Sequence, residues 1–418
     1  MKRLRVPGDK SISHRALMIA ALGTGRSRVR SILRSADIES TADVLRALGV
    51  HIPPLDGDEV VIEGVGLRGL KQPSVPLDCA NSGTTARLIS GIIAATPIEA
   101  ELIGDASLSR RPMGRVAAPL GAMGARFTLP PGGGLPLTIR GGKLQGITWH
   151  PDVASAQVKT AILFAGLVAD VPVEVHEPAQ TRDHTERMLR ARGVDIRAEN
   201  LVVSLLPSAR LDAGDVDVAG DPSSAMFIAG LAALGGVRGG AVRAENVGVN
   251  PARAGGFRAL VRMGVALTYE DTMVQGGEPV ATVVVGPGEL RGITIPPGEV
   301  PGLIDELPLI ACVAARAAGE TRVTGAGELR VKESDRITAV VDNLKAIGVD
   351  AEELPDGFIV RGSDRPLSGR VITHGDHRIA MAFGVLGAIA GNAIEIDDPA
   401  CCAVSWPSFW DDLRELTS

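Results

Sequence analysis

The chain has 418 residues and a formal net charge of −6, with 45% hydrophobic residues but only three Trp, one Tyr and seven Phe. This acidic, aromatic-poor composition excludes the broad basic surface and the stacking platforms that are typical of nucleic-acid-binding proteins. The longest uncharged apolar runs, 225–237 and 379–391, are too short to cross a membrane. Because this length exceeds one comfortable hydrophobic core, we expect two domains.

The N-terminus and the cysteines indicate a protein of a reducing compartment. Residues 1–7 are basic but lack the apolar core of a signal peptide. Cys79, Cys312, Cys401 and Cys402 show neither a Cys-x-x-Cys spacing nor a paired His pattern, which gives little support to a disulfide framework or a zinc site. We therefore expect reduced thiols, a cytoplasmic location and no bound metal.

The first predicted helix follows Pro7-Gly8-Asp9 and opens with Lys10 and Ser11. The first amides of a helix lack intrahelical partners and carry partial positive charge. Lys10, Ser11 and Arg15 would add a point charge, a hydroxyl donor and a bidentate fork, a combination that suits a phosphorylated ligand. The alternative interpretation is a Ser-capped helix with solvated charges.

A similar arrangement recurs along the chain. A turn rich in Gly, Ser, Asp or Pro leads into an apolar, Ala-rich helix six times, from positions 7, 80, 152, 220, 302 and 375. A second kind of helix ends in Leu-x-x-x-Gly at 45–49, 120–124, 189–193, 260–264 and 344–348, with β-prone segments following, as at 59–63, 201–205 and 358–361. The pattern predicts an α/β protein of six βαβ-type units, three in each of two closed domains.

These turns carry more cations than helix capping needs. Capping is the alternative explanation for Asn81 and Ser155. It does not explain cations, because positive charge at a helix N-terminus opposes the helix dipole. Such cations are Lys10, Arg15, Arg111, Lys332, Arg336 and Arg378. If the six helix N-termini face one way, these cations surround a multiply charged anion, and Asp305 and Glu333 become candidates for proton transfer.

Motifs of cofactor-binding proteins are missing from the sequence. Gly8-Asp9-Lys10-Ser11 matches only the last part of a nucleotide-binding P-loop, and no Gly-x-Gly-x-x-Gly follows a predicted strand. His377, at the start of the sixth apolar helix, fits a local hydrogen bond as well as a ligand contact. The sequence therefore predicts no cofactor.

Eight motifs in chain order resemble the 5-enolpyruvylshikimate-3-phosphate (EPSP) synthase family, and the resemblance covers the full length. They are PGDKSISHR at 7–15, NSGTTAR at 81–87, RPMGR at 111–115, ASAQ at 154–157, TRDHTE at 181–186, DELP at 305–308, RVKESDR at 330–336 and DHR at 376–378. Each motif alone is a modest signal. Their common order makes a chance resemblance implausible.

The resemblance implies a two-domain enolpyruvyl transferase fold of six repeated βαβαββ-type units, three per domain, with the active site in a cleft between the domains that closes on substrate. Residues 1–9 and 222–418 would form one discontinuous domain, and residues 10–221 the inserted domain. The implied reaction transfers the enolpyruvyl (1-carboxyvinyl) group of phosphoenolpyruvate to the 5-hydroxyl of 3-phosphoshikimate and releases phosphate, a shikimate-pathway step of chorismate and aromatic amino acid biosynthesis. The chain is expected to be a monomer whose partners are these two substrates. It is expected to need no cofactor and to bind neither nucleic acid nor a membrane.

The resemblance also assigns roles to single residues. It implies that Asp305 accepts the hydroxyl proton, that Glu333 donates a proton to carbon, and that Lys10 lies near both substrates. The residues implied for 3-phosphoshikimate are Lys10, Ser11, Arg15, Ser155, Ala156, Gln157, Arg182, Asp305 and Lys332. Those implied for phosphoenolpyruvate are Lys10, Asn81, Gly83, Arg111, Gln157, Arg336, His377 and Arg378.

Two positions carry further expectations. Some family members have a Lys near the C-terminus that contacts phosphoenolpyruvate, whereas this chain has Val404, so that contact should be absent or supplied by another group. Gly83 lacks a Cβ, which lets the backbone approach the ligand closely. We therefore expect inhibition by glyphosate, which resembles phosphoenolpyruvate but is longer, and loss of that inhibition in Gly83→Ala.

Two other functions stay open. The sister transferase that acts on UDP-N-acetylglucosamine shares the repeated fold, but it typically pairs Lys with Asn where this chain has Lys10-Ser11, and it uses a loop Cys that this chain lacks. A non-catalytic protein that binds an anionic metabolite is the second alternative. Such a protein would keep its ligand after loss of Asp305 and Glu333.

Overall fold

The computed structural model describes residues 1–57, 59–207 and 210–418, and the chain divides into two compact units. Unit 1 comprises Met1–Pro7, Ala219–Met273 and Pro279–Ser418, and unit 2 comprises Gly8–Val218 and Val274–Glu278. The predicted division placed Val274–Glu278 in the discontinuous domain. The segment groups with unit 2, where Glu278 Oε1 lies 2.8 Å from His184 Nδ1 and Gln275 Nε2 donates to the Asp217 carbonyl.

Unit 2 contains three strand–helix repeats. The first consists of α1 (Lys10–Leu22), β2 (Thr24–Arg30), α2 (Ala36–Ala47), β3 (Glu59–Val65) and β12 (Val216–Asp217). The second consists of β4 (Leu77–Asp78), α3 (Gly83–Ala94), β5 (Glu99–Ile103), η1 (Leu108–Arg110), α4 (Gly114–Met123), β6 (Arg126–Thr128) and β7 (Leu137–Arg140). The third consists of β8 (Ile147–Trp149), α5 (Ala156–Ala169), β9 (Val173–His176), α6 (His184–Arg190), β10 (Ile196–Glu199) and β11 (Val202–Leu205).

Unit 1 contains the other three repeats. The fourth consists of β1 (Lys2–Arg5), α7 (Pro222–Ala233), β13 (Val242–Gly248), α8 (Gly255–Arg262), β14 (Val265–Gln275) and β15 (Glu278–Gly288), except that the tip of β14 and β15, Val274–Glu278, groups with unit 2. The fifth consists of β16 (Thr294–Ile295), η2 (Val300–Gly302), α9 (Leu307–Ala314), β17 (Glu320–Val323), η3 (Gly327–Val331), α10 (Arg336–Ala346), β18 (Asp350–Leu354) and β19 (Gly357–Arg361). The sixth is shorter and consists of β20 (Ser368–Val371), α11 (His377–Gly387), β21 (Ala393–Ile396), η4 (Pro399–Val404) and α12 (Phe409–Thr417).

All six repeats pair their strands by one rule, which confirms the predicted α/β class and the six-fold repetition. The first strand of each repeat lies parallel to the second, as in β4 with β5, β8 with β9, β16 with β17 and β20 with β21. In the first five repeats the second strand also lies antiparallel to the last. The predicted strands at 59–63, 201–205 and 358–361 correspond to β3, β11 and β19.

In two repeats the first strand comes from a distant part of the chain. β1 pairs in parallel with β13 of unit 1, although the helix that follows β1 in the sequence, α1, belongs to unit 2. Conversely, β12 pairs in parallel with β2 of unit 2, while the next helix, α7, belongs to unit 1. The exchange explains why the chain passes between the units after Pro7 and again after Val218.

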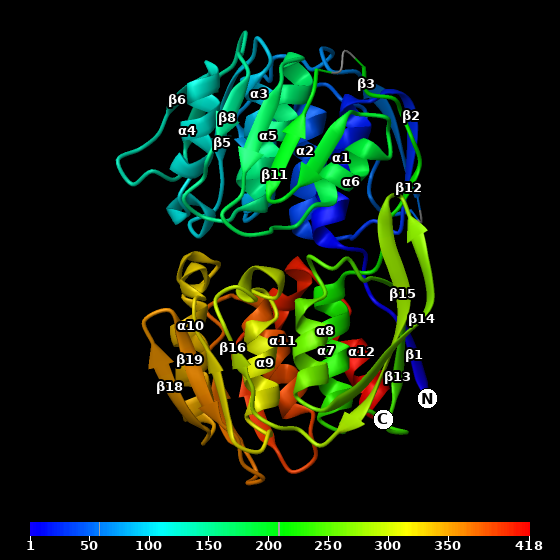
Figure 1. Cartoon of the computed structure of the whole chain (residues 1–418), viewed down its shortest axis with the longest axis vertical. Helices are drawn as coiled ribbons and strands as arrows, with labels where there is room; N and C mark the ends of the chain where they lie inside the picture. The colour runs from blue at the N-terminus through cyan, green and yellow to red at the C-terminus, as the bar shows by residue number, and fades with distance from the viewer. Residues whose placement is uncertain (58, 208–209) are drawn as a thin grey trace. The chain divides into compact units, whose positions relative to one another are not determined.

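The first helix of each repeat forms the core. In unit 1, α7, α9 and α11 pack against one another and the sheets lie outside them (Figure 1). In unit 2, α3 packs against both α1 and α5. Every residue of α7 and of α9 is buried, as expected for helices that are apolar on all sides. None of the helices in the described ranges is long and apolar enough to cross a membrane.

Close helix packing in unit 2 predicts a cost for enlarging Gly91 of α3. A Cβ at this position would lie 2.1 Å from the Ala161 carbonyl oxygen of α5, which is backbone and cannot turn away. We expect Gly91→Ala to lower the free energy of unfolding by about 1–3 kcal/mol in a denaturant titration. The matched control is Gly121→Ala in α4, where a Cβ meets no atom within 4 Å and the helix should gain up to about 1 kcal/mol. Equal effects of the two substitutions would contradict this packing.

Candidate active site

The predicted site residues form two clusters, one in each unit. They lie near the starts of the core helices and near the starts of the second helices α4, α6 and α10. In unit 2 the helix starts carry Lys10 and Ser11 on α1, Gly83 on α3 and Ala156 on α5. Several of these helices are also capped in the ordinary way. The side chains of Asp9, Ser82 and Ser155 accept hydrogen bonds from the first turns of α1, α3 and α5.

Three of the residues predicted for phosphoenolpyruvate in unit 2 make direct side-chain hydrogen bonds. Gln157 Nε2 donates to Thr84 Oγ1 at 2.9 Å, and its Oε1 accepts from Arg87 Nη1 at 2.7 Å. Arg111 Nη2 donates to Asn81 Oδ1 at 2.8 Å. The starts of α3 and α5 are thus held together by polar side chains. Arg87, which the resemblance left without a role, is part of this cluster.

Gly83 lies between the two guanidinium groups of this cluster. A Cβ built on Gly83 would lie 2.9 Å from Arg87 Nη1 and 3.3 Å from Arg111 Nη1. A side chain here would therefore displace the arginines that the cluster offers to an anion. The absence of a side chain keeps the backbone amides of the helix start open beside both cations.

Arg15 and Arg182 both contact Ser11 at the start of α1. Arg182 Nη1 donates to Ser11 Oγ at 3.2 Å, and Arg15 Nη1 donates to the Ser11 carbonyl at 2.9 Å. Arg15 is 2% exposed, and it also donates to the hydroxyls of Thr185 and Thr160 at 2.7 and 2.8 Å. Burial lowers the pKa of Arg15 to about 10, although the carboxylate of Glu186 opposes this, so Arg15 is charged at neutral pH.

Lys10 has a carboxylate partner that the sequence did not reveal. Its Nζ lies 2.5 Å from Asp37 Oδ2, in the first turn of α2. In the sequence, Asp37 is an acidic residue of the kind that favours any helix start, so nothing distinguished it. Nearby, burial lowers the pKa of His14 well below its usual value, and Lys10 and Arg15 lower it further. His14 is therefore neutral at pH 7, and its Nδ1 shares a hydrogen bond with Thr41 at 2.6 Å.

The cluster in unit 1 is built around Arg336, which is 1% exposed and contacts three carboxylates. Its Nε donates to Asp376 Oδ2 at 2.8 Å, its Nη2 to Glu333 Oε2 at 2.7 Å, and its Nη1 to Asp305 Oδ1 at 3.2 Å. Burial opposes the charge of Arg336, but these carboxylates raise its pKa above the usual value. Both predicted proton-transfer groups thus share one cation.

The remaining predicted residues of unit 1 lie around Asp305. Lys332 Nζ is 3.5 Å from Asp305 Oδ1, and Arg378 Nη1 donates to the Asp305 carbonyl at 3.3 Å. His377 is buried in the first turn of α11. Asp376 has no predicted role, yet it caps α11 by accepting from the Arg378 amide at 3.0 Å and is fully buried. Although burial raises it, the neighbouring Arg336 lowers the pKa of Asp376 below its ordinary value.

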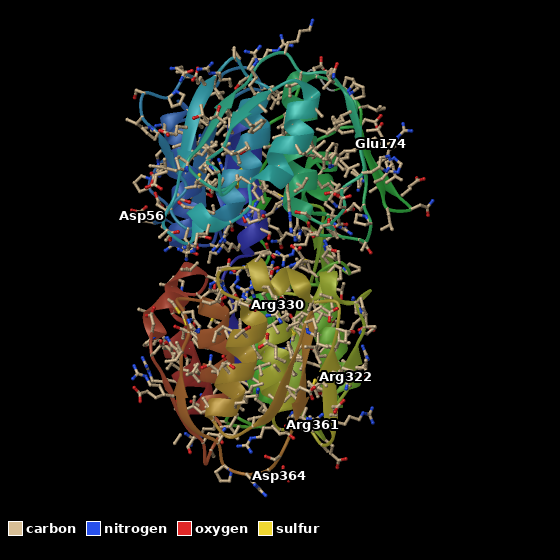
Figure 2. The ribbon with its side chains drawn as sticks, turned by 90° about the vertical axis from the view of Figure 1, so that its left-hand side faces the viewer. Asp56, Glu174, Arg322, Arg330, Arg361 and Asp364 are labelled. Carbon is tan, nitrogen blue, oxygen red and sulfur yellow. The ribbon has the colours of Figure 1, made fainter. Side chains whose placement is uncertain are left out.

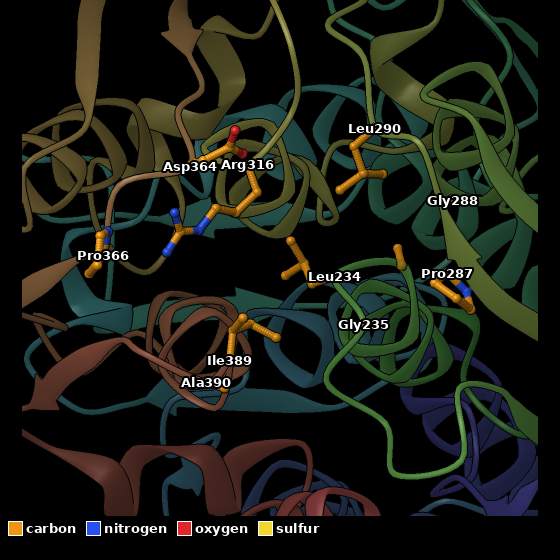
Figure 3. Close-up of a pocket in the computed structure, with 11 residues that line it drawn as sticks. Leu234, Gly235, Pro287, Gly288, Leu290, Arg316, Asp364, Pro366, Ile389 and Ala390 are labelled. Atoms are coloured by element: carbon orange, nitrogen blue, oxygen red, sulfur yellow. The ribbon is translucent and has the colours of Figure 1, made fainter.

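Unit 1 also contains a hollow of about 380 Å³ (Figure 3). It is lined by Ala233, Arg316 and Ile389, which lie at or just beyond the C-terminal ends of α7, α9 and α11. Figure 2 shows Arg330, close in sequence to Lys332, at one end of the unit and Asp364, which also lines the hollow, at the other. Helix C-termini carry partial negative charge, so the hollow is a poor site for an anionic substrate.

The described part of the chain contains no group of three or more His, Cys, Asp or Glu side chains arranged to hold a metal ion. Its four cysteines are unpaired thiols, and burial raises the pKa of Cys79 and Cys312 above the usual value. These thiols therefore stay protonated at neutral pH, as expected for core residues.

The bidentate pair between Arg336 and Asp376 predicts a pH-dependent contribution to stability. Because the pKa of Asp376 is below the ordinary 3.8, its carboxylate stabilises the fold above about pH 3.8, and this stabilisation is lost as the pH falls through the folded-state pKa. We expect Asp376→Asn to cost about 1.5–3 kcal/mol of unfolding free energy at pH 7, and less in acid. Asp411→Asn, which alters an exposed pair with Arg414, should change stability by less than about 0.5 kcal/mol. A cost for Asp376→Asn that is constant from pH 7 to pH 3 would be incompatible with this pairing.

Comparisons with known proteins identify the family. The family model of EPSP synthase (3-phosphoshikimate 1-carboxyvinyltransferase) matches residues 1–413. The chain is 44% identical over 419 residues to the 3-phosphoshikimate 1-carboxyvinyltransferase of Sulfurihydrogenibium sp. (strain YO3AOP1), covering 99% of this chain and 96% of the relative. It is 48% identical over 408 residues to the protein of the same name from Alkalilimnicola ehrlichii, covering 97% and 91%.

Solved structures give the same result. The structure of EPSP synthase from Acinetobacter baumannii matches with a TM-score of 0.87 and 42% identity, over 99% of this chain and 95% of that one. The enolpyruvyl transferase NikO from Streptomyces tendae matches with a TM-score of 0.79 over 100% and 94% of the two chains, but at 18% identity it shows a shared fold alone. With a family model that spans nearly the whole chain and relatives at this level of identity, the chain belongs to the EPSP synthase family.

Proposed function

We propose that this protein transfers the enolpyruvyl group of phosphoenolpyruvate to the 5-hydroxyl of 3-phosphoshikimate and releases phosphate, as a step of the shikimate pathway to chorismate and the aromatic amino acids. Membership of the EPSP synthase family supports the proposal. The observation in the structure that supports it most is the cluster of unit 1, where Lys332, Arg336 and Arg378 all contact Asp305 and Arg336 also donates to Glu333. Addition and elimination require this kind of site, because proton donors and acceptors must lie beside a bound anion.

The chemistry needs two proton transfers and one leaving group. In the addition, a proton joins the methylene carbon of phosphoenolpyruvate, and the 5-hydroxyl oxygen bonds to the neighbouring carbon while its own proton passes to a base. In the elimination, the carbon–oxygen bond to phosphate breaks and the new methyl group loses a proton, which restores the double bond. We assign the base to Asp305 and the donor to carbon to Glu333, with Lys10 near both substrates.

Arg336 offers a way to change the protonation of Glu333 or Asp305 when substrate binds. It donates to both Glu333 and Asp305. An oxygen of phosphoenolpyruvate that takes over one of these guanidinium N–H groups would free a carboxylate from its cation and put a negative charge beside it. Both changes favour the protonated carboxyl group that proton donation requires. Binding of the substrate anion would thus prepare the acid.

The two clusters serve one pair of substrates in this proposal. Unit 2 supplies Ser11, Arg15, Arg182 and the start of α5 to 3-phosphoshikimate, and Asn81, Gly83, Arg111 and Gln157 to phosphoenolpyruvate. Unit 1 supplies Lys332 and Asp305 to the first substrate, and Arg336, His377 and Arg378 to the second. Exclusion of water from the bound substrates would strengthen these charged contacts.

Several expectations stay predictions. They are the cytoplasmic location, the monomeric state, the inhibition by glyphosate and the lack of a required cofactor. Val404 ends η4 and is partly buried, and no group is assigned to the contact that a lysine makes there in other family members. Transfer to UDP-N-acetylglucosamine and simple metabolite binding are not favoured, because the curated relatives described above are named 3-phosphoshikimate 1-carboxyvinyltransferases.

Phosphate release from phosphoenolpyruvate tests the proposed function. We expect release with 3-phosphoshikimate and none with shikimate or UDP-N-acetylglucosamine. Asp305→Asn and Glu333→Gln should each lower kcat by about 100-fold or more, the usual size of a general acid–base contribution. Glu395→Gln, at an exposed position in the same unit, is the control and should keep wild-type kcat. Release with the UDP-sugar would move the chain to the sister activity, and tight substrate binding without turnover would favour the metabolite-binding alternative.

The position of Gly83 predicts resistance to glyphosate. In Gly83→Ala, the new methyl group would crowd Arg87 and Arg111, and a longer inhibitor has less room than phosphoenolpyruvate to adjust. We expect the glyphosate concentration for half inhibition to rise by about tenfold or more, equivalent to roughly 1.4 kcal/mol. The KM for phosphoenolpyruvate should rise less. Unchanged inhibition in a fully active variant would show that the methyl group does not reach the inhibitor.

A further inference from the structure

Three consecutive side chains in the first turn of α6 are fixed by buried polar contacts with different elements. His184 Nδ1 lies 2.8 Å from Glu278 Oε1 of β15, Thr185 Oγ1 accepts from Arg15 of α1, and Glu186 Oε1 lies 2.6 Å from Lys159 Nζ of α5. All three residues are at most 2% exposed. α6 has only seven residues and packs beside α1 (Figure 1). A helix of this length is not stable alone, so its position depends on these contacts.

The contact with Lys159 extends to the segment that precedes α6. Lys159 Nζ also lies 2.9 Å from Glu177 Oε2, and the other oxygen of that carboxylate accepts a hydrogen bond from Thr181 Oγ1. Lys159 is 2% exposed. Burial disfavours its charge, but Glu186 and Glu177 raise its pKa above the usual value, so the ammonium group stays charged. One buried cation therefore connects both ends of the segment from Glu177 to Glu186.

This segment carries Arg182, the residue that donates to Ser11 at the start of α1. A buried ion cluster contributes little net stability, because desolvation offsets much of the attraction. It does impose a fixed geometry, since each charge must keep its partners. The Lys159 cluster and Thr181 thus determine where the backbone next to Arg182 lies.

We propose that Lys159, together with Glu177 and Glu186, is a positioning residue for the acceptor substrate, because it holds the Thr181–Arg182 segment where Arg182 and Ser11 can bind an anionic group of 3-phosphoshikimate. This inference rests on the proposed function and adds to it a cause of affinity for this acceptor. Neither glutamate nor Lys159 is proposed to touch substrate. They act by determining where the Arg182 guanidinium group lies.

Removal of the ammonium group gives the inference a specific signature. Lys159→Met would leave Glu177 and Glu186 as neighbouring buried carboxylates, and like charges in such a site cannot both ionise easily. One of the two carboxylates then takes up a proton, so the position of the segment from Glu177 to Glu186 depends on pH. Other charged groups lie around this cluster. Arg15 of α1 faces Glu186, while Asp9, Arg182 and Glu278 face Arg15, and His184 lies 2.8 Å from Glu278.

The test compares steady-state kinetics of the full-length wild type, Lys159→Met and the double variant Lys159→Met/Glu186→Gln between pH 6 and pH 9. In Lys159→Met we expect the KM for 3-phosphoshikimate to rise about tenfold or more and to depend on pH, while the KM for phosphoenolpyruvate changes less than about twofold. The double variant restores the net charge of the three positions and offers Glu177 an amide donor. It should therefore recover most of the affinity and lose the pH dependence. Lys143→Met, at an exposed position of the same unit, is the control.

The possible outcomes separate the inference from the proposed function. If the wild type does not act on 3-phosphoshikimate, the proposed function fails and the inference fails with it. If the wild type is active and Lys159→Met keeps both the KM for 3-phosphoshikimate and its pH profile, only the inference is overturned, even where thermal stability falls. Should Lys159→Met not fold, Glu186→Gln alone keeps the side-chain volume. An unchanged KM for 3-phosphoshikimate in that variant would equally overturn the inference.

Discussion

The site in unit 1 depends on one buried arginine. Arg336 has almost no contact with solvent, and three carboxylates from three segments of the chain accept its hydrogen bonds. Asp376 accepts two of these hydrogen bonds, which fix the guanidinium group, and its own position is fixed because it caps α11. Glu333 and Asp305 accept the others. In the proposed function, a cation held in this way would attract the substrate anion and keep the proposed acid and base within reach of it.

The repeated fold explains why such groups gather at one place in each unit. The core helices consist mainly of small, apolar residues, which allows them to pack closely. Gly91 of α3, for example, packs against Ala161 of α5. Their N-termini carry the partial positive charge that binds anions, and their C-termini carry the opposite charge. Side chains that bind anions are therefore expected near the starts of these helices, and Arg336, the first residue of α10, shows that second helices contribute to the cluster as well. The hollow beside Arg316 lies at the opposite, unsuitable end.

Much of the fold was predictable, because helix starts and ends are local signals. The turn before Lys10 and the small-residue helices predicted the core, and the six-fold recurrence predicted the repeats. The exchange of β1 and β12 was not predictable from periodicity, since a short strand does not reveal its partner. The contacts between individual side chains were not predictable from the sequence either. Asp37 resembles any acidic residue of a first helical turn, and only the fold brings it to Lys10. The roles of the predicted site residues stay proposals.

The most direct test of addition followed by elimination is to run the reaction in D2O with phosphoenolpyruvate and 3-phosphoshikimate and to analyse the product by mass spectrometry and proton NMR. Because a solvent-derived deuteron joins the methylene carbon before a proton is lost from the new methyl group, we expect deuterium in the vinyl methylene of the product. Recovered phosphoenolpyruvate should carry the label only where 3-phosphoshikimate was present. A product that forms with release of phosphate but without deuterium at this carbon would contradict the proposed mechanism.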